Sequence, residues 1–266
     1  MKYETIIFDQ QDQAACITLN RPERLNAINT QMITELNHAY RRIEDDPDIW
    51  CYIVTGAGDR ALCAGADVSR PAGLAPRDEP VLASYTEWDA PQEATPPYLQ
   101  MTKPMICAVN GLAAGAGLDL ITTSDIAIAA TEATFFDPHV SIGIVSGREM
   151  VRLARVLPLN IAMRVALMGK YERMTAQRAY DLGLVSELVP RPSLIERAWE
   201  IAATINLNAP LAVRGTRLAI RKGLSLPVYE AEVLAESHRL RVAATEDAKE
   251  GPRAFMEKRD PAWKAQ

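Results

Sequence analysis

The sequence is poor in the features that mark nucleic-acid-binding and membrane proteins. Acidic residues outnumber basic ones, which gives the 266 residues a net charge of −5, whereas binding to a phosphate backbone requires a basic face. No apolar run approaches the roughly 20 residues that cross a bilayer, and the first residues lack the apolar core of a signal peptide. We therefore expect neither a nucleic-acid partner nor a membrane partner.

Cysteine and histidine are also scarce. The four cysteines (Cys16, Cys51, Cys63 and Cys107) lie far apart without a CxxC pair, and only three histidines are present. This spacing indicates neither a zinc site nor a thiol nucleophile, so no metal is expected. Reduced, mostly buried cysteines are typical of a cytoplasmic protein, which is the location we expect.

Two loops of small residues are the most informative feature that is present. The first is Ala64-Gly65-Ala66-Asp67 and the second runs from Gly111 to Gly117; each comes after an apolar strand-like run, at 50–55 and 105–109. Glycine and alanine leave backbone N–H groups open to a ligand. Two such donors on one carbonyl oxygen would form an oxyanion hole, so the loops predict an enzyme that acts on a carbonyl compound.

A nucleotide-binding interpretation of the second loop is less favoured. A dinucleotide fold has G-x-G-x-x-G in its first strand-to-helix turn. Here the glycines stand at 111, 115 and 117, which is the wrong order, and several strands precede them. The phosphate-binding pattern G-x-x-x-x-G-K-[ST] is absent from the sequence.

The order of the expected elements predicts an α/β core followed by a helical C-terminal region. Strands are expected at 3–8 and 14–19, an amphipathic helix from Thr30 as N-cap, and at 50–55 a strand covered on both faces. From residue 148 onward one strand, at 185–189, interrupts helices at 148–156, 160–168, 175–182, 194–206, 211–222 and 228–244.

One segment, 70–97, concentrates proline. It holds six of the 17 prolines, together with Tyr85 and Trp88, and Tyr98 follows directly. Proline at this density breaks regular structure, so the segment is either a pocket wall that shapes specificity or a variable surface insertion. The sequence leaves both open.

Short motifs in a fixed order carry a family resemblance. They are LNRPERLNA at 19–27, VTG at 54–56, LCAGAD at 62–67, KP at 103–104, AVNG at 108–111, GAG at 115–117, SD at 124–125 and AFMEKR at 254–259. Together they resemble the enoyl-CoA hydratase/isomerase (crotonase) superfamily over nearly the whole chain. The resemblance implies a spiral of repeated ββα units, with a core at 1–200 and a helical region at 201–266 for trimerisation.

The resemblance also implies the positions of the oxyanion donors. In the family, one N–H comes from the residue after the first-loop glycine, here Ala66, and the other from the second loop, here Ala116. Position 116 is also where a helix is expected to start, and free N–H groups at a helix start favour negative charge. The alternative is that the small residues merely permit tight packing.

By the same resemblance the substrate is an acyl-CoA thioester of the fatty-acid type, with no prosthetic group. Cationic Arg24 and Lys258 suit the phosphates of coenzyme A, although Lys258 could equally be a solvated surface charge. The resemblance implies a trimer or a pair of trimers, in which a neighbouring subunit's C-terminal helix completes each site. The positions that match the family's coenzyme A contacts are Arg24, Ala27, Ala64, Asp67, Phe255 and Lys258.

The catalytic positions depart from the family pattern. Hydratases of this kind carry two glutamates where this chain has Asp119 and His139. Aspartate is shorter than glutamate by about 1.5 Å, whereas imidazole can both take and give a proton near neutral pH. Asp137 could orient His139 if a strand puts both on one face, but Pro138 lies between them. Alternatively, His139 only lines the pocket.

We therefore predict hydration and dehydration at the α,β-positions of a thioester, with Asp119 positioning water and His139 moving the proton at the α-carbon. The alternatives are a hydrolase, a carbon–carbon lyase or an isomerase that uses His139, or a CoA-binding protein that has lost catalysis. Ser146 and Glu149 rank lower as candidates. Gly147 stands where dienoyl isomerases carry a third carboxylate, which disfavours that reaction.

Overall fold

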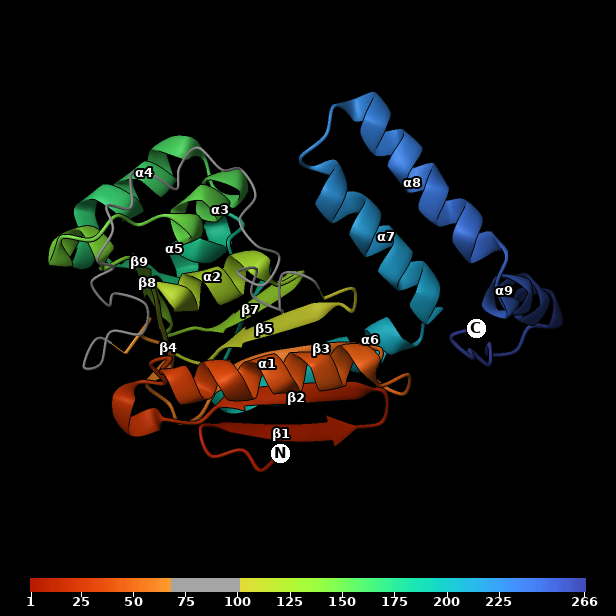
Figure 1. Ribbon diagram of the computed structural model, residues 1–266, viewed down its shortest axis with the longest axis horizontal. Coiled ribbons are helices and arrows are strands. Elements are labelled where there is room, and N and C mark those ends of the chain that lie inside the picture. Colours follow the sequence, from red (N-terminus) through yellow and green to blue (C-terminus); the bar gives the residue numbers. More distant parts are fainter. Residues whose placement is uncertain (68–100) are drawn as a thin grey trace, which may run out of the picture.

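Two β-sheets form the centre of the computed structural model, which describes residues 1–67 and 101–266 (Figure 1). The proline-rich segment at 70–97 and Tyr98, which the sequence interprets either as a pocket wall or as a surface insertion, lie outside the described residues.

The larger sheet has the strand order β1-β2-β3-β5-β7-β10. β1 and β2 are antiparallel and the remaining neighbours are parallel. In β3 every residue is buried; Ile53 packs in one apolar cluster with α6, and Tyr52 and Val54 pack in another on the opposite face. This confirms the prediction of a strand covered on both faces. The strands are Ile6–Gln11 (β1), Ala14–Leu19 (β2), Cys51–Gly56 (β3), Met105–Val109 (β5), Ile126–Ala130 (β7) and Glu187–Val189 (β10).

The smaller sheet has the order β4-β6-β8-β9, in which β4, β6 and β8 are parallel and β9 is antiparallel. β4, β6 and β8 each follow a strand of the larger sheet, so the chain passes repeatedly from one sheet to the other. This alternation, with α1 between β2 and β3 and α2 between β6 and β7, fits the expected ββα repeats. The strands are Ala61–Cys63 (β4), Leu112–Ala114 (β6), Thr134–Phe136 (β8) and Met174–Thr175 (β9).

Helices cover both faces of the larger sheet. α1 buries Met32, Leu36 and Tyr40 on one face, and α6 buries Ala198 and Ala202 on the other. Within the described residues, no helix has both the length and the apolar character that a membrane span needs. The helices are Thr30–Asp45 (α1), Ala116–Thr123 (α2), Arg148–Val156 (α3), Leu159–Met168 (α4), Ala176–Asp181 (α5), Leu194–Asn206 (α6), Pro210–Gly223 (α7), Val228–Ala243 (α8) and Glu246–Glu257 (α9), with short 3₁₀ turns at Pro22–Arg24 (η1), His139–Ile142 (η5), Gly169–Tyr171 (η6) and Arg191–Ser193 (η7).

Several expectations were wrong in detail. The N-cap of α1 is Asn29, whose side chain accepts from the amide of Met32 at 2.8 Å, so Thr30 is the first helical residue. β1 starts at Ile6 rather than at residue 3, because Ile6 pairs with Leu19, the last residue of β2. The bounds of α9 were not predicted within the expected helical region, since Pro252 lies inside this helix.

The C-terminal helices extend away from the sheets. Figure 1 shows α7 and α8 side by side, with α9 at the end farthest from β4 and β8. The expected boundary at residue 200 falls within α6, whose Ala198 and Ala202 are buried against the sheet. That domain division stays a prediction.

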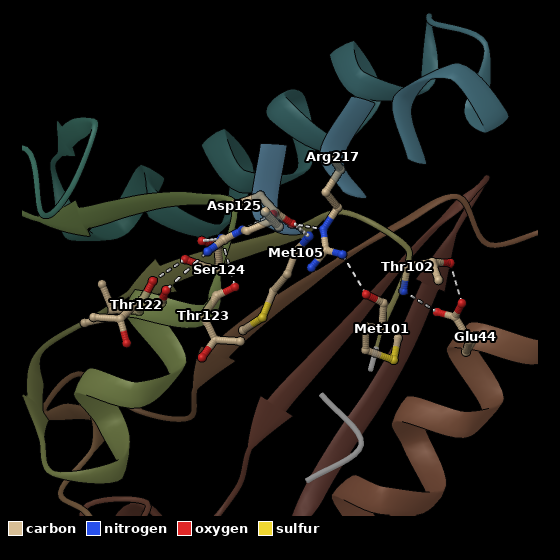
Figure 2. A network of polar contacts seen from close by, with 11 residues as sticks. Glu44, Met101, Thr102, Met105, Thr122, Thr123, Ser124, Asp125 and Arg217 are labelled. Carbon is tan, nitrogen blue, oxygen red and sulfur yellow. Dashed lines mark hydrogen bonds and ion pairs between the residues drawn. The ribbon is translucent and has the colours of Figure 1, made fainter. Parts of the chain in front are cut away.

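An ion-pair network anchors α7 to the core (Figure 2). Asp125 accepts from Arg217 Nε at 2.6 Å and from Arg221 Nε at 2.8 Å, and it also accepts from the amide of Met105 at 2.8 Å. Arg217 further donates to the carbonyl of Met101 at 2.6 Å. Arg221 reaches the carbonyls at the C-terminal end of α2, which ties α7 to the helix that begins at Ala116.

Replacing Asp125 by alanine should destabilise the fold, because it leaves two partly buried guanidinium groups without their carboxylate. We expect the free energy of unfolding to fall by about 2 kcal/mol, less than for a fully buried pair because some hydration remains. Urea denaturation at one fixed protein concentration measures the change. The control is Asp48→Ala, an exposed position, and equal stability of the two variants would contradict the anchoring role.

Candidate active site

The candidate site lies at the ends of three parallel strands. Cys63 pairs with Ala113, and Ala114 pairs with Phe136, so β4, β6 and β8 end at one edge of the smaller sheet. The segments that follow these strands are 64–67, 115–119 and 137–139. The structure thus brings together both small-residue loops and His139, as the sequence predicted.

Gly115 shows how close these segments come. It has a φ of 51° and a ψ of −115°, a conformation that only glycine adopts readily. A Cβ atom at this position would lie 3.3 Å from His139 Cε1 and 3.5 Å from the Cα of Gly65. The imidazole therefore stands directly beside both loops.

The amides of Ala66 and Ala116 are available to a ligand. Ala66 forms a parallel bridge with Ile28, in which the carbonyl of Gly65 and the amide of Asp67 are used, so the amide of Ala66 points away. Ala116 is the first residue of α2, where backbone N–H groups have no partner within the helix. Neither amide donates a hydrogen bond to any residue in 1–67 or 101–266.

His139 is paired with a buried carboxylate. Its Nδ1 lies 2.7 Å from Oδ1 of Asp137, a side chain that is 0% exposed. Asp137 accepts from Nδ1–H, so the second ring nitrogen, Nε2, is the one left for a ligand. The hydrogen bond to Asp137 raises the pKa of His139 above its usual 6.5; burial opposes this rise, and the charges of Asp137 and Glu149 add to it.

This pair forms across a turn and not along a strand, so the strand arrangement that Pro138 put in question is absent here. β8 ends at Phe136, Pro138 has α-helical backbone angles, and His139 starts the turn η5. The rigid ring of proline fixes this reversal, which folds the imidazole back onto Asp137.

Asp119 is held by two arginines that the sequence analysis missed. It lies one turn into α2 and is 2% exposed. Arg152 Nη1 is 2.5 Å from its Oδ1, and Arg148 Nε is 3.5 Å from its Oδ2. Residues four apart share one face of a helix, so the sequence could have placed the two arginines on the same face of α3. It could not show that Asp119 is their partner.

Four of the six residues expected to contact coenzyme A lie together: Arg24, Ala27, Ala64 and Asp67. The amide of Ala64 donates to the carbonyl of Leu25 at 3.0 Å, which joins the two segments. Arg21, another residue that the sequence analysis missed, donates to the carbonyl of Ala27 at 2.6 Å and pairs with Asp67 at 2.8 Å. Arg24 is exposed.

Phe255 and Lys258 do not join this group within one chain. Phe255 lies in the last turn of α9 and Lys258 caps that helix, and Figure 1 shows α9 far from β4. Phe255 is 82% exposed, and its neighbour Met256 is 79% exposed, so two large apolar side chains lie next to each other on the surface of α9.

A groove of about 770 Å³ lies elsewhere, between α7 and the C-terminal end of α2. Ile121, Asp125 and Arg217 line it, whereas Asp119 and His139 do not. Among the described residues, no three histidine, cysteine, aspartate or glutamate side chains are grouped so that they could hold a metal ion.

We expect the pKa of His139 to lie above 6.5 and to fall when Asp137 is replaced by asparagine, because the neutral amide no longer stabilises the imidazolium. NMR titration of the ring protons measures both values. The other two histidines, His38 and His238, provide internal references. A pKa that does not change in Asp137→Asn would contradict the pairing.

The chain is similar to proteins of one family along nearly its whole length. The family model described as Enoyl-CoA hydratase/isomerase matches residues 9–266. A crystal structure of an enoyl-CoA hydratase/isomerase from Mycobacterium paratuberculosis has 57% sequence identity and a TM-score of 0.87, with 99% of each chain covered.

Curated relatives agree with this match. The (E)-benzylidenesuccinyl-CoA hydratase of Thauera aromatica is 34% identical over 262 residues, covering 97% of this chain and 98% of that protein. The short-chain-enoyl-CoA hydratase of Clostridium acetobutylicum is 31% identical over 265 residues, covering 97% of each. The motifs, the ββα repeats and these similarities lead to one conclusion: the chain belongs to the enoyl-CoA hydratase/isomerase family.

Proposed function

We propose that the protein adds water across the α,β-double bond of an enoyl-CoA thioester, and eliminates it in reverse, through an enolate. Membership of the family makes it an acyl-CoA-processing enzyme of the hydratase type. The observation that carries the specific reaction is the shared strand edge, where two free amides stand beside a histidine–aspartate pair.

In this proposal the amides of Ala66 and Ala116 hold the thioester oxygen. Negative charge grows on that oxygen as the enolate forms, and donors fixed in advance stabilise it without reorganisation. The start of α2 adds its own dipole at Ala116. The loss of one such donor typically costs about 3 kcal/mol of barrier.

His139 moves the proton. Neutral Nε2 takes a proton from water while the water oxygen bonds to the β-carbon and the double-bond electrons move onto the thioester oxygen. The imidazolium then returns a proton to the α-carbon, and the enolate collapses to the β-hydroxyacyl thioester. Asp137 stabilises the intermediate imidazolium and fixes the ring. Dehydration follows the same steps in reverse.

Asp119 positions the water in this scheme. Arg152 Nη1 lies 2.5 Å from Oδ1 and fixes the carboxylate, and each carboxylate oxygen can accept more than one hydrogen bond, so it can also accept from water. A carboxylate fixed in this way orients a nucleophile more firmly than a freely rotating one does.

Coenzyme A is proposed to lie along η1 and the first small-residue loop, with Arg24 near a phosphate. Exposed Phe255 and the absence of any buried residue in α8 support a homo-oligomer, a trimer or a dimer of trimers, in which α9 of a neighbouring copy completes the site. Four free, buried cysteines fit a cytoplasmic location.

Hydration of crotonyl-CoA tests the proposal. We expect His139→Gln to lower kcat by about 100- to 10,000-fold, the usual contribution of a general acid–base group. The loss of ultraviolet absorbance of the enoyl thioester reports the reaction. His38→Gln is the matched control, because His38 lies on the surface of α1, where it contacts Tyr3, and is not part of the candidate site. Unchanged hydration in His139→Gln would overturn the mechanism.

The pH dependence gives a second test. The reaction needs neutral imidazole, so kcat/KM should rise with pH through a pKa above 6.5 and level off once His139 is deprotonated. In Asp137→Asn the midpoint should move to lower pH, and the plateau should fall because the ring loses its orientation. A midpoint that stays in place would show that another group limits the rate.

Thioester hydrolysis is the second candidate function, since a histidine–aspartate pair can also activate water for attack on a carbonyl carbon. Hydrolysis releases the free thiol of coenzyme A, whereas hydration leaves the thioester intact. A thiol reagent in the crotonyl-CoA assay, and in a second assay with a β-keto acyl-CoA, therefore separates the hydratase from a hydrolase or a carbon–carbon lyase.

A further inference from the structure

Arg148 enters the mechanism above only as the more distant of the two arginines beside Asp119, and it lies beside the candidate site. Its side chain is 47% exposed, and its Nε stands 3.5 Å from Oδ2 of Asp119. None of its five N–H groups donates a hydrogen bond to a residue in the described ranges 1–67 and 101–266. Arginine is well suited to a planar anion, because two of its donors can bind both oxygens of a carboxylate.

Asp119 carries one negative charge, and two arginines, Arg148 and Arg152, lie beside it. Arg152 already neutralises Asp119 at 2.5 Å and donates to Thr123 Oγ1 at 3.1 Å as well. Glu149, the next residue, forms no ion pair with either arginine in the described part of the chain, and its charge acts on His139. Within residues 1–67 and 101–266, the Arg148 guanidinium thus has donors left over that can bind the anion of a ligand.

The position of Arg148 matches the far end of an acyl group. Ala116 and Asp119 are three residues apart in α2, which is a rise of about 5 Å. Nε of Arg148 lies 3.5 Å from Oδ2 of Asp119. These two separations are short enough for an acyl chain of about four to six carbons to reach Arg148 from a thioester held at Ala116.

We propose that Arg148 binds a carboxylate at the far end of the acyl group, so that the enzyme acts on CoA thioesters of dicarboxylic acids. This proposal rests on the proposed placement of the thioester oxygen. It makes Arg148 a specificity-determining residue: it selects the substrate and takes no part in proton transfer.

A matched substrate pair tests the proposal. The probes are two six-carbon 2-enoyl-CoA thioesters, one with a terminal carboxylate and one with a methyl group. We expect wild-type kcat/KM to be about 10- to 100-fold higher for the acid, as a charge-assisted hydrogen bond predicts. Arg148→Met should abolish this ratio, and Arg148→Lys should keep part of it. The control is Arg155→Met on the same helix, where the side chain contacts Ser225 instead.

The other source of an anion is a phosphate of coenzyme A. In that case Arg148→Met lowers kcat/KM equally for both thioesters, and the wild-type enzyme shows no preference for the acid. Either result overturns the proposal.

Binding of saturated analogues keeps this test separate from the proposed reaction. Calorimetry compares adipoyl-CoA with hexanoyl-CoA, neither of which can be hydrated. Tighter binding of adipoyl-CoA that disappears in Arg148→Met supports the carboxylate site even if no hydration is found. Equal binding of the two analogues overturns the site even if hydration is found.

Discussion

The parallel pairing of β4, β6 and β8 is the constraint on which the site depends. Each strand has only three residues, but pairing fixes their ends in register, and the chain after each strand contributes one part of the chemistry. The larger sheet and its helices hold these short strands in place, since each follows a strand of that sheet. A site assembled in this way tolerates little movement of any single loop.

Charge compensation is the second theme. Asp119 and Asp137 are almost fully buried, and both are paired, with arginine and with histidine respectively. A buried carboxylate without such a partner would be costly. The two pairs differ in chemistry, because guanidinium stays protonated whereas imidazole releases its proton near neutral pH. One pair can therefore orient a nucleophile while the other exchanges protons.

The sequence predicted the larger elements and the family well. Apolar periodicity located α1, and helices were also expected where α3 and α6 lie. The loop motifs, through the family resemblance, pointed to Ala66 and Ala116, which the structure places beside His139; their roles stay predictions. The strands of the smaller sheet were missed because two or three residues carry no periodic pattern, and α9 was missed because its proline usually ends a helix. The partners of Asp119 could not be found, since α2 and α3 meet only in three dimensions.

The helix α2 is fixed at both of its ends. At its start, a side chain on Gly117 would collide with the carbonyl of Cys63, so the helix lies directly on β4. At its finish, Arg221 of α7 binds three of its last carbonyls. α2 therefore links the edge of the smaller sheet to the C-terminal helices through direct contacts at both of its ends. A tilt of α7 must either stretch those hydrogen bonds or move α2, so the positions of the outer helices and of the Ala116 amide are mechanically coupled.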